Sequence, residues 1–85
     1  MSVPTSLYSA DHERLVALLR DYRESAGLRQ VELAARLRRP QSFVSKYESG
    51  QRRLDLIELD EICRALGVEL QTFVERWRQG RDPRL

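Results

Sequence analysis

The sequence predicts a compact all-α domain of five helices, and three observations carry that prediction. Apolar residues recur at spacings of three and four along nearly the whole chain, which is the period of an amphipathic helix. No segment alternates apolar and polar residues between turn signals, as a half-buried strand would. Glycine, proline and helix-capping residues interrupt the pattern at short intervals, so short connections join the helices.

Length and composition exclude several classes of protein. The 85 residues allow one domain with a small core, and the 41% apolar content is too high for a disordered chain. No apolar run approaches the roughly 20 residues that cross a bilayer, and the first residues do not resemble a signal peptide. One cysteine and one histidine cannot form an internal disulfide or a closed zinc site. We therefore expect a cytoplasmic domain without a metal or cofactor.

The first two helices are predicted over residues 11–25 and 30–37, after an irregular arm at 1–10. Gly27 is expected to end the first helix in the left-handed conformation, and Leu28 to fold back onto it. The buried stripe of the first helix is expected to comprise Leu15, Leu18, Leu19, Tyr22 and Ala26, and that of the second Leu33, Ala34 and Leu37.

The other three helices complete a domain that is expected to span residues 11–79, with a frayed tail at 80–85. The third helix covers about 40–49, because Pro40 suits the first turn of a helix. The fourth begins after the N-cap Asp55, with Glu58 in capping-box spacing, and the last covers about 70–78. The expected apolar face of the fourth comprises Leu56, Leu59, Ile62, Cys63 and Leu66, and that of the last Leu70, Phe73, Val74 and Trp77.

Charge divides the chain into unlike segments. Residues 28–53 carry seven basic and two acidic side chains, whereas residues 54–75 carry one basic and six acidic side chains. The first segment could meet a polyanion that the second would repel. In the basic segment, a break of about three residues separates two short helices and forces them to cross steeply, which is the helix-turn-helix arrangement.

The third helix turns short polar side chains outward. Its inward face is apolar, whereas Gln41, Ser42, Ser45 and Lys46 lie on the outward face, and Glu48 lies only near its margin. Glutamine, serine and lysine are residue types that pair with base edges in the major groove of DNA. A merely solvated helix face would more often mix acidic and basic residues.

These segments resemble the Cro and phage-repressor helix-turn-helix family, the xenobiotic-response-element type of bacterial regulator. The resemblance runs from about residue 19 to 70, spans four helices in order, and rests on Leu28–Gln30, Glu32–Ala34, Pro40–Gly50 and Ala65–Val68. It implies a DNA-binding transcriptional regulator, most simply a repressor.

The resemblance also implies roles for single residues. Gln30 would touch a phosphate and brace Gln41, which would read a base. The other expected base-reading residues are Ser42, Ser45 and Lys46. The remaining contacts expected along the DNA backbone are Arg29, Arg38, Arg39, Phe43, Arg52 and Arg53.

Three positions depart from the family pattern. Arg29 replaces the usual Ser or Thr at the N-cap of the second helix, which forfeits about 1 kcal/mol of capping. Arg38 replaces the usual glycine of the turn, so we expect either a positive φ, at a cost of roughly 1–2 kcal/mol, or a remodelled turn. Glu69 stands where Ser or Asp would better cap the last helix.

Other residues have simpler interpretations. Phe43 lies on the rim of the third helix, where it could touch a thymine methyl, pack on a sugar or cover the second helix. Cys63 is expected to be a buried core thiol, and His12 to be exposed.

A homodimer is expected from the size of the binding site. One recognition helix reads four or five base pairs, a word that recurs too often in a genome to be specific, whereas two copies could read half-sites about 34 Å apart. The expected dimer surface is the last helix, through Leu70, Phe73 and Trp77, together with Leu7 and Tyr8 of the arm. Trp77 could instead cap the core.

A second interpretation belongs to another functional class. The fold could serve as a protein-binding module, such as an antitoxin or an adaptor, and the acidic segment 54–75 and the helix that carries Trp77 favour that alternative. An enzyme is the weakest interpretation, because no expected nucleophile lies near a base and no acidic pair adjoins a phosphate loop.

Overall fold

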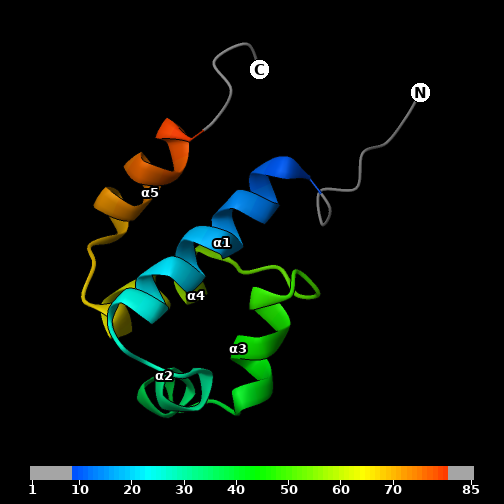
Figure 1. Ribbon diagram of the computed structural model, residues 1–85, viewed down its shortest axis with the longest axis vertical. Helices are drawn as coiled ribbons and strands as arrows, with labels where there is room; N and C mark the ends of the chain where they lie inside the picture. Colours follow the sequence, from blue (N-terminus) through cyan, green and yellow to red (C-terminus); the bar gives the residue numbers. More distant parts are fainter. Residues whose placement is uncertain (1–8, 81–85) are drawn as a thin grey trace.

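Five helices make up the part of the chain that the computed structural model describes, residues 9–80 (Figure 1). They are α1 (Ala10–Ser25), α2 (Gln30–Leu37), α3 (Gln41–Glu48), α4 (Leu56–Leu66) and α5 (Leu70–Gln79). The all-α prediction is therefore confirmed, and the described residues contain no strand. The predicted arm, apart from residues 9 and 10, and the tail beyond residue 80 lie outside this range.

Local capping chemistry sets the helix ends largely as predicted. Gly27 has a φ of 74°, and the Leu28 N–H returns to the Arg23 carbonyl at 3.1 Å, which closes α1. At the start of α4, Asp55 accepts from the Glu58 N–H at 2.7 Å, while the Glu58 carboxylate accepts from the Asp55 N–H at 3.0 Å. The predicted third helix differs by one residue at each end, because its first and last residues are the two caps of α3.

The turn between α2 and α3 keeps the left-handed geometry. Arg38 has a φ of 57° and a ψ of 43°, although it carries a side chain. Its N–H bonds to the Ala35 carbonyl, and the Arg39 N–H to the Ala34 carbonyl. Of the two outcomes expected for this turn, the structure takes the positive φ.

The core lies where all five helices meet. Its fully buried side chains come from every helix: Leu19, Leu33, Val44, Tyr47, Ile62, Cys63 and Phe73. In Figure 1, α1 runs diagonally across the molecule, α5 lies beside it, and α2 and α3 lie below it. Cys63 is buried as expected.

The buried face of α1 is wider than the one predicted: Leu15, Leu18, Leu19 and Tyr22 pack on the core as expected, but they are not alone there. Ala26 is exposed because it caps the helix, whereas Val16 and Arg23 are buried. His12 was expected to be exposed, but only 5% of its surface is accessible to solvent. The first turn of α1 packs against α5 and lies close to Arg53. Burial, with a smaller effect of the Arg53 charge, lowers the pKa of the His12 imidazole.

The apolar face of α5 is used within the chain itself. Phe73 is fully buried, so its assignment to a dimer surface is wrong. The Trp77 indole N–H donates to the Asp11 carbonyl at 2.9 Å, and the Arg14 guanidinium lies 5.4 Å from the Trp77 ring centroid. Trp77 therefore packs against α1, and Leu70 is half-buried. Leu7 and Tyr8, the other residues of that predicted surface, lie outside the described residues.

None of the helices within residues 9–80 combines the length and the hydropathy needed to span a lipid bilayer.

Candidate nucleic-acid interface

The outward face of α3 is open to solvent. Gln41, Ser42 and Lys46 are exposed, and Ser45 is half-buried with its hydroxyl donating to the Ser42 carbonyl at 3.3 Å. The opposite face is apolar, because Val44 and Tyr47 are fully buried. The four residues predicted to read bases therefore lie on one side of α3.

The crossing of α2 and α3 turns this face away from the core. In Figure 1, α2 is seen nearly end-on and α3 from the side, so the two helices cross rather than lie parallel. Ala34 is 2% exposed, and its small side chain allows the close approach of helices that a steep crossing needs. The helix-turn-helix arrangement inferred from the short break is confirmed.

The one carboxylate of α3 is withdrawn from its surface. Glu48 is 4% exposed, and its two oxygens accept from Arg23 Nε at 2.7 Å and Arg23 Nη2 at 3.0 Å. This pairing raises the pKa of the Arg23 guanidinium. The Arg20 guanidinium reaches the Glu48 carbonyl at 3.3 Å, and Arg23 Nη1 donates to the Leu28 carbonyl. Glu48 thus fastens the end of α3 to α1.

Gln30 belongs to the same network. Its side-chain amide donates to Glu48 Oε1 at 2.9 Å, which links the first residue of α2 to the end of α3. The resemblance implied that Gln30 would brace Gln41, but in this structure the amide faces Glu48. Glu48 attracts it because a buried carboxylate has more acceptor sites than Arg23 alone fills.

Two of the predicted backbone-contacting arginines are held against α4. The Arg52 guanidinium forms a bidentate pair with Glu58, at 3.0 and 2.8 Å, and Arg39 lies 3.3 Å from Glu61 and 3.7 Å from Glu58. The Arg52 pairing, helped by the Asp55 N–H, lowers the pKa of the Glu58 carboxyl to about 2. Arg39 and Arg52 are therefore only half-exposed, and their charges are paired with these acids.

Phe43 supports these arginines and is itself covered by them. The Arg39 and Arg52 guanidinium carbons lie 4.4 and 4.9 Å from the Phe43 ring centroid, and the ring is 8% exposed. Phe43 is therefore buried rather than on the rim of α3, and its ring is not open to the DNA backbone as expected. Of its alternative roles, packing inside the helix-turn-helix fits the structure, because its edge also meets Tyr47.

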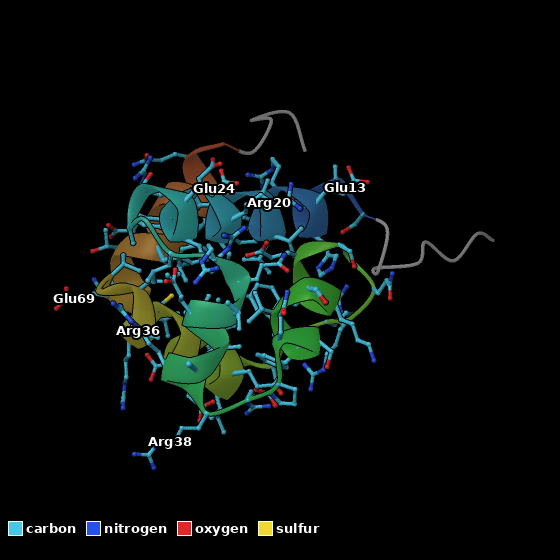
Figure 2. All side chains as sticks on the ribbon, turned by 60° about the horizontal axis from the view of Figure 1, so that its bottom comes forward. Glu13, Arg20, Glu24, Arg36, Arg38 and Glu69 are labelled. Carbon is cyan, nitrogen blue, oxygen red and sulfur yellow. The ribbon has the colours of Figure 1, made fainter. Side chains whose placement is uncertain are left out.

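Three cations of the helix-turn-helix and of the loop that follows it are left without an acidic partner in the described part of the chain. Within residues 9–80, Arg38, Lys46 and Arg53 are exposed and form no ion pair. Figure 2 shows Arg38 extending from the α2–α3 turn away from the body of the molecule. These three residues are separated from one another along the chain, but all belong to the helix-turn-helix or to the loop that follows it.

The start of α2 is a further place where an anion could bind. Arg29, 76% exposed at its side chain, supplies no capping bond, as its residue type predicts. The Glu32 carboxylate instead accepts from the Arg29 N–H at 2.8 Å. This hydrogen bond is the main reason that the pKa of the Glu32 carboxyl is lowered. The N–H groups of Gln30 and Val31 come before the first intrahelical bond and remain available to a phosphate.

Sequence reasoning missed the Arg23–Glu48 pair, although a signal was present. Arg23 lies four residues after Leu19, on the side of α1 that also carries Val16, so a helical projection places it beside the buried stripe. A lone arginine there requires a buried acid as its partner. Glu48, the one acid of the third helix and near the margin of its outward face, was the candidate.

Comparisons with known proteins agree with this geometry. A helix-turn-helix family model matches residues 19–73, which is more than half of the chain. An XRE-family like protein from Pseudomonas syringae pv. tomato is 46% identical, with a TM-score of 0.79 over 82% of this chain and 85% of that one. A search of curated protein sequences finds no match.

Two further solved structures share the fold. The clp gene regulator ClgR from C. glutamicum is 26% identical, with a TM-score of 0.75 over 92% of this chain and 96% of that one. The restriction-modification controller protein C.Esp1396I, solved as a tetramer with its natural 35 base-pair operator, is 22% identical, with a TM-score of 0.77 over 84% of this chain and 93% of that one. The chain thus belongs to the Cro/phage-repressor-like, XRE-type helix-turn-helix family.

Proposed function

We propose that this protein is a sequence-specific, double-stranded DNA-binding transcriptional regulator that places α3 in the major groove. One observation carries the proposal: the outward face of α3 offers amide, hydroxyl and ammonium groups, while its only acid is buried in an ion pair. A helix whose exposed face has no carboxylate can approach the phosphates without repulsion.

Each residue of the interface has a chemically defined role. Gln41 can pair with an adenine edge through two hydrogen bonds, Lys46 can donate to guanine, and Ser42 and Ser45 can donate or accept. Arg38 and Arg53 supply phosphate contacts, Arg29 adds a weaker one because Glu32 pairs with it, and Gln30 joins them if its amide leaves Glu48. Arg39 and Arg52 contribute more weakly, because their charges are partly neutralised by α4.

The protein is proposed to act as a dimeric repressor. Two copies reading half-sites one helical turn apart give a site long enough to be found in a genome. A domain that only occupies its site can repress by excluding other proteins from that DNA. ClgR is a gene regulator and C.Esp1396I was solved as a tetramer on its operator, and both are consistent with such a role. The cytoplasm, on the bacterial nucleoid, is the corresponding place of action.

Selection of bound sequences from a random duplex pool at low ionic strength tests this proposal. We expect a short recurring sequence, present twice with a fixed spacing, whose affinity falls steeply as salt is added. Arg53→Ala should weaken all duplexes alike and leave the selected sequence unchanged. Retention of duplexes with no common sequence, or no retention of any duplex, would contradict the proposal.

A further inference from the structure

A cavity of about 390 Å³ lies between the first turn of α1 and the α5 helix, with α4 and the loop before it on a further side. Its volume falls within the roughly 300–1,000 Å³ of pockets that hold small organic ligands. The apolar side chains that line it come from three helices: Leu15, Leu59, Phe73, Val74 and Trp77. The cavity can therefore surround the apolar body of a small molecule.

One polar group that lines this cavity is buried without a partner. His12 is 5% exposed, and its Nε2 atom forms no hydrogen bond within the described part of the chain. Buried polar atoms in folded proteins nearly always have a partner, so an unsatisfied one indicates a group that is missing from the protein alone. An imidazole nitrogen that carries its proton can donate to a ligand oxygen.

The charges around the cavity favour an anion. Arg53 lines it, is exposed and forms no ion pair within residues 9–80. Asp11, the acid among the lining residues, has its carboxylate neutralised by Arg14 Nη2 at 3.0 Å. A carboxylate offers two oxygens, one for the guanidinium and one for the imidazole, and it matches the fork of an arginine.

We propose that this cavity is a binding site for a small carboxylic acid whose apolar body is about the size of one aromatic ring with a short chain. The apolar side chains of α1, α4 and α5 enclose the body, Arg53 pairs with the carboxylate, and His12 Nε2 donates to its second oxygen. The proposal goes beyond the proposed function, since no residue of α3 lines the cavity in the described range and binding needs no DNA.

Trp77 makes the site observable, because it is the only tryptophan of the chain and it lines the cavity. The probe is 3-phenylpropionate, titrated into the full chain in the absence of DNA. We expect the Trp77 emission to change and to saturate with a dissociation constant below about 1 mM. The alcohol 3-phenylpropanol keeps the apolar body without the charge, and it should bind at least about tenfold more weakly.

Variants of the two polar residues separate recognition of the acid from apolar burial. Arg53→Met should weaken 3-phenylpropionate at least about tenfold and leave the affinity for the alcohol unchanged. The matched control is Arg38→Met, which removes another exposed arginine without an ion pair that does not line the cavity, and it should bind the acid like the wild type. His12→Phe keeps a ring but removes Nε2, and it should weaken the acid about tenfold with helicity unchanged by circular dichroism.

Several results would overturn the proposal. These are a Trp77 emission that does not saturate with the acid, equal affinities for the acid and the alcohol, or equal losses in Arg53→Met and Arg38→Met. An emission that ignores the acid but shifts in the double variant Leu7→Ala/Tyr8→Ala would also overturn it and would assign the cavity to the chain's own arm. Because these titrations contain no DNA, their failure is distinct from failure of the proposed function.

Discussion

The side chain that most controls the position of α3 is Glu48, a carboxylate held away from water by Arg23, Gln30 and Arg20. A buried ion pair contributes little net stability, because desolvation of both charges opposes their attraction. Its value here is geometric, since it connects the end of α3 with α1 and α2. The recognition face is thus oriented by a charge network as well as by apolar packing.

Removing this carboxylate should be costly. Glu48→Ala leaves the Arg23 guanidinium buried without its partner, and we expect the free energy of unfolding to fall by about 3–5 kcal/mol. Urea unfolding followed by Trp77 fluorescence measures it. The matched control is Glu24→Ala, because Glu24 lies 4.0 Å from the same guanidinium with its side chain 62% exposed, and it should cost under about 0.5 kcal/mol. Equal costs for the two variants would contradict the account.

Glu58 predicts how acid affects the fold. The pKa of its carboxyl is lowered from 4.5 to about 2, chiefly by Arg52. The ionised carboxylate therefore stabilises the folded state relative to the unfolded state at any pH above the ordinary pKa. The stabilisation is complete above about pH 4.5 and is lost as the pH falls towards 2. Glu58→Gln keeps the capping acceptor but not the charge, and its stability should therefore change less over this range. Thermal melts between pH 2 and 7 make the comparison, and parallel curves for both proteins would contradict it.

At the scale of single elements, the sequence predicts helix ends better than helix faces. Gly27, Asp55 and Arg38 act through their own backbone or through neighbours three or four residues away, so local reasoning located them. Which side of a helix is buried depends on the other helices. Ala26 and Leu56 were therefore assigned to the core although both are exposed.

In the candidate site, too, the features set by local sequence could be predicted, whereas those set by contacts between helices could not. The outward positions of α3 follow from its period and from the family resemblance, and the structure leaves them open. The arginine–acid pairs of Arg39 and Arg52 join the basic segment to α4 over 6 to 22 residues, and no local pattern indicates them. Phe43 could be placed only once both guanidinium groups were seen against its ring.

The α2–α3 turn contains a strained residue that glycine would relieve. Arg38→Gly should raise the free energy of unfolding by about 1 kcal/mol, because glycine adopts a φ of 57° without steric cost. The same change two residues earlier, Arg36→Gly, lies inside α2 and should lower the free energy of unfolding by about 1 kcal/mol or more. Chemical denaturation of the two variants gives the signs, and a loss of stability in Arg38→Gly would contradict the strain at this turn.

For the whole molecule, the uneven distribution of charge matters more than its net value. The chain carries only +2, but the segment that contains α2 and α3 is basic and the segment that contains α4 is acidic. The acids of α4 neutralise Arg39 and Arg52 and leave Arg38, Lys46 and Arg53 free. The molecule therefore presents a cationic face to DNA without being strongly basic overall.

This polarity predicts the dependence of DNA binding on salt. Each lost phosphate contact should reduce the slope of log affinity against log salt by about one. Arg53→Ala should show this reduction, whereas Arg52→Ala should show a smaller one because Glu58 already neutralises Arg52. Anisotropy titrations between about 50 and 200 mM salt measure both slopes, and a larger effect at Arg52 would contradict the assignment of free and paired arginines.

The most direct test of the central claim is the base preference of Gln41→Ala. Wild-type protein and the variant are titrated against the selected duplex and against every single base-pair change within one half-site. The account predicts that discrimination worth about 1–3 kcal/mol disappears at one base pair in the variant and persists at the others. An unchanged preference at every position would show that the outward face of α3 does not read DNA.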